Sequence, residues 1–233
     1  YFFKLHTIKN GESYFIYSLR FLRNHGDGPT TYYVVMVDSA KRYQAQTRDY
    51  LYRCIRQALL AYSLLGALLQ TLGGVLETLD RVEAGSPGFG FRTVLIGLAY
   101  LCLLGAVIEL RRSTTAGRGR VVRVALMVAG AGWVLSAVAQ LVLNIDSDVA
   151  EKALFPIATI AIGAGMLVVG IDVLRARRWS AWRRWVPLVC GVYPFVAIFP
   201  SFAAAGQPNF PVLTGWGLCW LFLAVALWPR EQN

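Results

Sequence analysis

Residues 157–185 read IATIAIGAGMLVVGIDVLRARRWSAWRRW, an apolar run that ends in a cluster of arginine and tryptophan. The first 18 residues contain one charged side chain, Asp172, and the 11 that follow contain five arginines and no acid. About 20 apolar residues cross the ~30 Å hydrocarbon core of a bilayer as a helix, and arginine directly after such a run is typical of its cytoplasmic end. The stretch therefore predicts a transmembrane helix whose carboxyl end faces the cytoplasm.

The rest of the chain repeats this apolar pattern. Hydrophobic residues make up 56% of the 233 residues and charged residues 15%, whereas soluble domains hold about 45–50% and about 25%. Because backbone groups in lipid must bond internally and barrel strands would be shorter and alternating, runs this apolar are helices. The sequence predicts an all-α membrane protein, a six-transmembrane-helix bundle, with spans at 57–77, 93–110, 124–143, 157–174, 186–205 and 214–228.

Charge in the loops predicts the orientation of these spans. The loops at 111–123 and 175–185 carry ten arginines and no acid, whereas the loops on the other side carry three basic residues, Arg81, Arg92 and Lys152. Short loops rich in arginine and lysine stay in the cytoplasm. We expect a multi-pass protein integral to the cytoplasmic (inner) membrane, with both the N- and the C-terminus cytoplasmic.

Residues 1–54 differ in character from the rest. Residues 1–8 and 12–21 read as two strands around the turn Lys9-Asn10-Gly11, and 30–37 as a third strand. A polar helix is expected to begin at Ser39 and continue into the first span. We predict a small cytoplasmic β-rich element plus linking helix at 1–54 and a six-helix transmembrane domain at 55–233. Fifty residues bury little core, so we expect this element to bind a protein partner or further copies of the chain.

Proline and glycine mark positions within the spans. Pro194 and Pro200 should distort the fifth span and free backbone carbonyls for other partners, which suits either a packing kink or a binding site. The three helical hairpins resemble one another loosely, and a hairpin repeat stays open. Small residues are expected to let helices approach closely: Gly66, Gly73, Gly74, Gly130, Gly132, Gly163, Gly165 and Gly170.

Four polar side chains form a candidate ligand-binding set toward the outer ends of the spans. Gln70 and Glu77 are seven residues apart in the first span, and Gln140 and Asn144 are four apart in the third, so each pair shares one helix face. If the two helices meet, the four side chains line one outward-facing pocket. The alternative is interhelical hydrogen bonding. Glu77 is the strongest choice for a proton or cation role.

Two carboxylates lie near the cytoplasmic ends of their spans. Glu109 and Asp172 each precede an arginine by three residues, Arg112 and Arg175, which places both members of each pair on one helix face. The spacing favours ion pairs in which the arginine reaches the interface. A functional intramembrane charge stays open, more so for Asp172, which lies deeper.

The arginine cluster after the fourth span reads as a membrane-interface segment. Tryptophan prefers the headgroup level, and arginine there attracts anionic lipid. We expect a partner in the lipid bilayer, including its anionic lipids, and no nucleic acid, because a loop held against lipid at both ends offers little surface to read a groove. The expected lipid-interface residues are Arg175, Arg177, Arg178, Trp179, Trp182, Arg183, Arg184 and Trp185.

Several functional classes are disfavoured because the sequence lacks the residues or motifs that they require. The two histidines, His6 and His25, lie outside the spans, which excludes a bis-histidine haem within the membrane, and no lysine is available there for a retinal Schiff base. The four cysteines are far apart, so neither a zinc site nor a disulfide framework is expected. Motifs of hydrolases, nucleotide-binding proteins and zinc proteases are missing. We expect no metal, no cofactor and no catalytic residues, and an enzyme is the weaker interpretation.

Three hypotheses for function follow. The first is an accessory or sensor subunit of a membrane assembly, whose cytoplasmic N-terminal element binds a partner. The second is a transporter of a small solute, because a six-span chain with both ends inside resembles in outline the substrate-binding components of vitamin uptake systems. The third is an intramembrane enzyme that acts on lipid, for which the sequence offers no convincing acid, base or metal set.

Overall fold

The computed structural model describes residues 15–20, 31–36, 39–79, 87–113, 119–177, 179, 181–206 and 209–228. The chain divides into two compact units, Tyr1–Ile55 and Arg56–Asn233. Six helical stretches of the described residues are long and apolar enough to cross a membrane, which confirms the predicted number of spans. They are Tyr50–Leu79, Gly88–Arg112, Arg120–Val142, Ser147–Ala176, Ala181–Ala205 and Phe210–Leu227.

Four of the spans belong to single helices and two are composite. The single helices are α1 (Ser39–Leu79), α2 (Pro87–Arg112), α3 (Arg120–Val142) and α8 (Phe210–Leu227). The fourth span joins α4 (Ser147–Val149), the π-helix η1 (Ala150–Leu154) and α5 (Phe155–Ala176). The fifth joins the 3₁₀-helix η2 (Ala181–Trp185), α6 (Val186–Tyr193), the π-helix η3 (Pro194–Ile198) and α7 (Phe199–Ala205).

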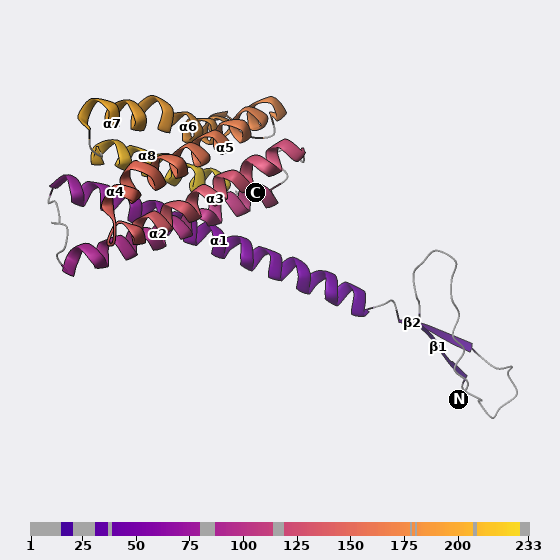
Figure 1. Ribbon diagram of the computed structural model, residues 1–233. Coiled ribbons are helices and arrows are strands. Elements are labelled where there is room, and N and C mark those ends of the chain that lie inside the picture. The colour runs from indigo at the N-terminus through magenta and orange to yellow at the C-terminus, as the bar shows by residue number, and fades with distance from the viewer. Residues whose placement is uncertain are drawn as a thin grey trace, which may run out of the picture. The chain divides into compact units, whose positions relative to one another are not determined.

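The spanning helices pack in chain order around a common interior (Figure 1). Helix α2 packs on α3, α3 on α5, α5 on α6 and α6 on α8, and α8 also contacts α2. The part of α1 from Arg56 onward packs on both α2 and α8. Gly66 of α1 faces Ala99 of α2, and Gly74 of α1 faces Thr214 of α8. The bundle is therefore closed, with its last helix beside its first two.

Glycine sets the closest helix contacts, as the sequence predicts. A Cβ added at Gly132 of α3 would lie 2.8 Å from the carbonyl oxygen of Ala158 in α5, and one added at Gly165 of α5 would lie 2.5 Å from that of Ala125 in α3. Real Cβ atoms do not approach a carbonyl oxygen this closely, so each position requires glycine. Without a hydrophobic force between helices in lipid, such contacts supply much of the attraction.

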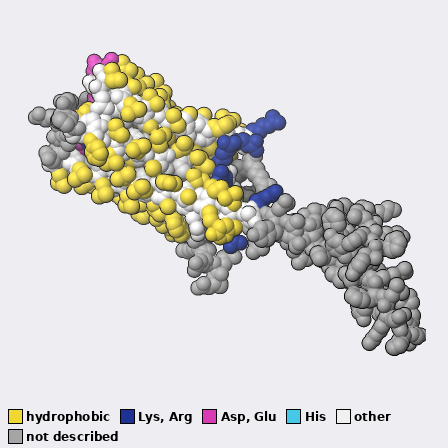
Figure 2. All heavy atoms as spheres, turned by 90° about the horizontal axis from the view of Figure 1, so that it is seen from below, with side chains coloured by type: hydrophobic (Ala, Val, Ile, Leu, Met, Phe, Trp, Pro, Cys, Tyr) yellow, Lys and Arg dark blue, Asp and Glu magenta, His cyan; other side chains and the backbone are white. Residues whose placement is uncertain are grey.

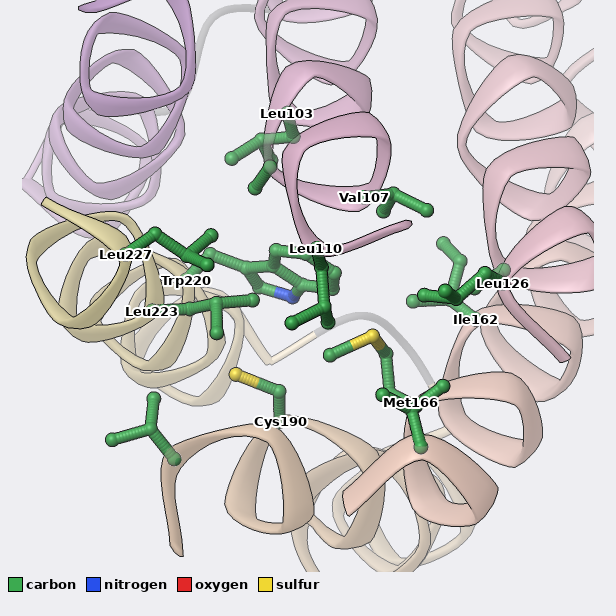
Figure 3. Packing of buried hydrophobic residues seen from close by; sticks show 14 of the residues in the cluster. Leu103, Val107, Leu110, Leu126, Ile162, Met166, Cys190, Trp220, Leu223 and Leu227 are labelled. Carbon is green, nitrogen blue, oxygen red and sulfur yellow. The ribbon is translucent and has the colours of Figure 1, made fainter. Parts of the chain in front are cut away.

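Aromatic side chains fill the centre of the bundle. Trp133 of α3 is fully buried, and its ring centroid lies 5.3 Å from that of Tyr100, 5.3 Å from that of Trp216 and 4.9 Å from that of Trp220. Side chains from four other helices point into the same interior (Figure 3): Leu110 of α2, Met166 of α5, Cys190 of α6 and again Trp220 of α8. The interior is thus a packed core with contributions from helices far apart in the sequence.

The unit Tyr1–Ile55 contains two described strands. Strand β1 (Phe15–Arg20) pairs antiparallel with β2 (Thr31–Met36), with Phe15 opposite Met36 and Arg20 opposite Thr31. These are the second and third of the strands expected from the sequence. The first expected strand, at 1–8, and the turn at 9–11 lie outside the described residues, so the three-stranded element stays a prediction.

Candidate functional site

Of the four polar side chains predicted to form a site, Gln70 and Glu77 lie on α1 and are both buried. The carboxylate of Glu77 forms an ion pair with Arg92 in the first turns of α2. The guanidinium of Arg92 also lies 4.7 Å from the ring centroid of Phe89. Because arginine stays protonated in proteins, Arg92 is a permanent counter-ion for Glu77. Among the described residues, Oε1 of Gln70 has no hydrogen-bond partner.

Gln140 and Asn144 lie at the carboxyl end of α3 and just beyond it, and they too contact α2. Nδ2 of Asn144 donates to Oγ1 of Thr93 at 2.7 Å, and the buried Thr93 hydroxyl donates to the carbonyl oxygen of Gly90 at 2.9 Å. The buried amide of Gln140 shares a hydrogen bond with the hydroxyl of Tyr100. Gln140 and Asn144 are thus tied to α2 by side-chain hydrogen bonds.

Helix α2 supplies the partner of three of the four predicted residues. Arg92, Thr93 and Tyr100 pair with Glu77, Asn144 and Gln140 respectively. The sequence interpretation missed this role of α2. A signal was present, because Thr93 and Tyr100 are seven residues apart and so share one helix face. The contacts of the described residues form an interhelical polar network across α1, α2 and α3, and the predicted pocket stays a prediction.

A second polar contact lies near the arginine-rich end of the bundle. Glu109 of α2 is 1% exposed, and its Oε1 accepts from Nε of Arg56 in α1 at 2.7 Å. Nη2 of Arg56 also donates to the carbonyl oxygen of Leu227 at 3.4 Å. The sequence did not predict Arg56 as the partner of Glu109, from which it is 53 positions away, and the expected pair with Arg112 stays a prediction. Arg56 therefore joins α1, α2 and the carboxyl end of α8.

Asp172 lies on α5, three residues before Arg175. Its predicted pairing with that arginine and its functional role both stay predictions. On the face that Figure 2 shows, lysine and arginine gather at one end of the bundle and aspartate and glutamate at the opposite end. At the acidic end, the exposed pair Lys152 and Asp148 lies 2.9 Å apart.

The predicted interface segment begins in α5 and ends in η2. Trp182 and Trp185 are exposed, whereas Trp179 packs against the apolar core. Arg183 and Arg184 follow Trp182 in η2 and are partly buried. Arg175 and Arg177 lie at the end of α5, and Arg178 lies outside the described residues.

Pro194 of the fifth span frees a backbone carbonyl, as the sequence predicts, whereas Pro200 lies in the first turn of α7. Pro194 begins the π-helix η3, and because it has no N–H, the carbonyl of Cys190 four residues earlier loses its usual helical donor. The indole Nε1 of Trp216 in α8 donates to this carbonyl at 3.4 Å. The hydroxyl of Tyr193 donates to the carbonyl of Val212 at 3.0 Å. The break in the helix therefore serves to bind α6 to α8.

The chemistry of the described residues offers no metal centre: no group of three or more histidine, cysteine, aspartate or glutamate side chains among them could hold a metal ion. The described cysteines, Cys54, Cys102, Cys190 and Cys219, carry free thiols. No protein-family model, no curated protein and no solved structure matches the chain. Six apolar helices make it a multi-pass membrane protein, and its specific role must be argued from its own residues.

Proposed function

We propose that the protein is an accessory or sensor subunit of a membrane assembly, and that residues 1–54 bind a protein partner or a second copy of the chain. The observation that carries this proposal is α1, which runs without interruption from Ser39, through the first span, to Leu79. A continuous helix gives a partner bound near its amino end a covalent and helical connection to the membrane bundle.

The interior of the bundle supports a role in assembly. Among the described residues, the buried carboxylates Glu77 and Glu109 are each paired with an arginine from a neighbouring helix. An acid or base in catalysis or proton transfer needs a charge that changes easily, whereas paired charges favour a fixed arrangement. These pairs and the aromatic core together form a scaffold that holds α1 in place.

The orientation belongs to the same proposal. The arginine-rich end of the bundle lies on the cytoplasmic side of the inner membrane, and so do both termini. Charge separation along the bundle supports this orientation, because short loops rich in arginine stay on the cytoplasmic side. A partner of residues 1–54 is then a cytoplasmic protein or the cytoplasmic part of a membrane protein.

The test compares the full chain with a variant that lacks residues 1–38 and so retains α1. Both are purified from native membranes after mild chemical cross-linking, and proteins bound to each are quantified by mass spectrometry. We expect at least one partner, or a cross-linked dimer, that is present with the full chain and lost with the deletion. The control is the thermal stability of the bundle, which should be equal in both. An identical set of bound proteins from both variants would contradict the proposal.

Transport of a small solute is the second candidate, and the break in the fifth span favours it. Transporter sites use interrupted helices, and here the π-helix η3 separates α6 from α7. The unpartnered Oε1 of Gln70 offers an acceptor for a solute. Uptake into proteoliposomes is the test. If Glu77 couples uptake to protons, Glu77→Gln abolishes the coupling, and an unchanged rate and pH profile would exclude that role.

A further inference from the structure

The short helix η2, Ala181–Trp185, is held in a strained turn at the arginine-rich end of the bundle. Two residues in or just before it adopt the left-handed region, Arg177 at φ 50° and Ala181 at φ 46°. Side chains with a Cβ adopt this conformation rarely and at a cost in energy. Such strain persists where the surrounding contacts fix the backbone, and it gathers at functional sites.

Contacts with α8 hold η2 in position. The ring of Trp182 packs edge-on against that of Phe222, with centroids 6.4 Å apart. Nη1 of Arg183 donates to the carbonyl oxygen of Trp228, the residue that caps α8, at 3.5 Å. The carboxyl end of a helix carries partial negative charge, so this arginine is placed favourably. The turn is therefore a built feature, fixed against the end of α8.

The two arginines of η2 keep donors that the protein does not use. Nε of Arg183 and Nε of Arg184 are both buried, and neither has a hydrogen-bond partner among the described residues. Arg183 uses Nη1 for Trp228, whereas its Nε is not used by any described residue. In arginine, Nε and Nη2 form one edge with two parallel N–H groups, and their spacing matches two oxygens of a phosphate once the side chain turns this edge toward it.

The tryptophans beside these arginines indicate where the phosphate comes from. Trp182 is 44% exposed and Trp185 49% exposed. The guanidinium of Arg183 lies 5.9 Å from the ring centroid of Trp182, and that of Arg184 lies 5.8 Å from that of Trp185. Exposed tryptophan at the end of a span lies at the headgroup level of a bilayer. Each arginine is thus paired with a ring at the depth of lipid phosphates.

We propose that η2 binds the phosphate of an anionic phospholipid headgroup. The Nε edges of Arg183 and Arg184 donate to the phosphate oxygens, and the rings of Trp182 and Trp185 lie against the lipid below the headgroup. The bound lipid stabilises the strained turn on the carboxyl end of α8. This inference is independent of the proposed role of residues 1–54.

The test is a titration of the purified full chain with phosphatidylglycerol, and separately with phosphatidylcholine, read by native mass spectrometry. We expect the wild type to bind phosphatidylglycerol more tightly. A charge-assisted hydrogen bond to a phosphate contributes about tenfold to binding, so the double variant R183Q/R184Q, which loses one or more such bonds at each arginine, should bind phosphatidylglycerol about a hundredfold more weakly. An affinity equal to that of the wild type would overturn the proposal.

Two further variants separate a site from a general charge effect. Arg120 and Arg123 are exposed at the start of α3, also within the arginine-rich loops, and R120Q/R123Q removes the same charge. We expect this control to bind nearly as the wild type does, and an equal loss would overturn the proposal. R183K/R184K keeps the charge and removes the Nε edges, so it should bind more weakly than the wild type. Full binding by this lysine variant would overturn the proposal as well.

A competition experiment separates lipid from free phosphate. Inorganic phosphate added to the complex should leave phosphatidylglycerol bound, because the tryptophans contact only the lipid. Displacement of the lipid by inorganic phosphate at similar concentration would show a site for a soluble anion instead.

Discussion

Replacing Arg56 with methionine is expected to destabilise the bundle more than replacing its ion-pair partner Glu109 with glutamine. The two side chains differ in their access to solvent, since Arg56 is 33% exposed and Glu109 1% exposed. Without Arg56, the buried carboxyl group loses its hydrogen-bonded counter-ion, and it either bears the cost of a desolvated charge or takes up a proton. Without the carboxylate, the arginine extends its long side chain to the interface.

The magnitudes follow from this difference in burial. Removing one partner so that a buried charge is left alone costs about 3–5 kcal/mol of unfolding free energy. Glu109→Gln keeps an oxygen that accepts from Arg56 and loses only the charge, at about 1–2 kcal/mol. In the double variant R56M/E109Q no buried charge is left, so we expect Glu109→Gln to recover part of the stability that Arg56→Met loses.

The assay is unfolding of the purified protein in mixed micelles by increasing SDS, followed by far-ultraviolet circular dichroism. Lys152→Gln is the matched control, because the pair of Lys152 and Asp148 is 73% and 77% exposed and should contribute no more than about 1 kcal/mol. The reasoning is refuted if Arg56→Met costs no more than Glu109→Gln, or if the double variant loses the sum of the two single losses.

Three further substitutions test the packing of the bundle by the same assay. Gly132→Leu should cost about 1–3 kcal/mol, because the new side chain meets α5, whereas Gly119→Leu should cost almost nothing, since no atom lies within 4 Å of an added Cβ. Trp133→Ala should cost about 3–5 kcal/mol, because it empties the space between three aromatic rings, and a loss below 1 kcal/mol would contradict a packed core. Trp216→Phe keeps an aromatic side chain but removes part of the buried ring and the donor to the Cys190 carbonyl, so we expect a loss of at least about 1 kcal/mol. An unchanged stability would show that this hydrogen bond contributes nothing.

The six spans could be predicted from the sequence because length and apolarity alone decide what crosses a bilayer. Their ends could not, since helices continue through polar residues at the interface. The polar helix that begins at Ser39 and continues into the first span was predicted, whereas the fourth span was expected to begin at 157 and its helix begins at Ser147. The carbonyl that Pro194 frees could be predicted, because proline lacks a backbone N–H whatever residues surround it in the fold.

The candidate site was harder to predict, because periodicity shows which face of a helix is polar but does not show which other helix packs against that face. Gln70 and Glu77 were predicted to line a pocket with residues of the third span if the two helices meet, and the ion-pair partner of Glu77, Arg92 of α2, was not predicted. Sequence spacing likewise suggested Arg112 for Glu109, whereas packing brings Arg56 to it from α1. Neighbouring helices are determined by close contacts at residues such as Gly66. A single sequence does not show which helix makes each of these contacts.

The orientation of the bundle determines which compartment residues 1–54 reach, and cysteine labelling measures it directly. Gly119 and Ser147 are exposed just outside opposite ends of α3, so G119C and S147C form a matched pair in a background that carries Cys54→Ser. A membrane-impermeant maleimide is applied to sealed vesicles of known sidedness. The account predicts that G119C reacts only from the cytoplasmic side and S147C only from the opposite side. Reversed labelling, or labelling of both from one side, would contradict it.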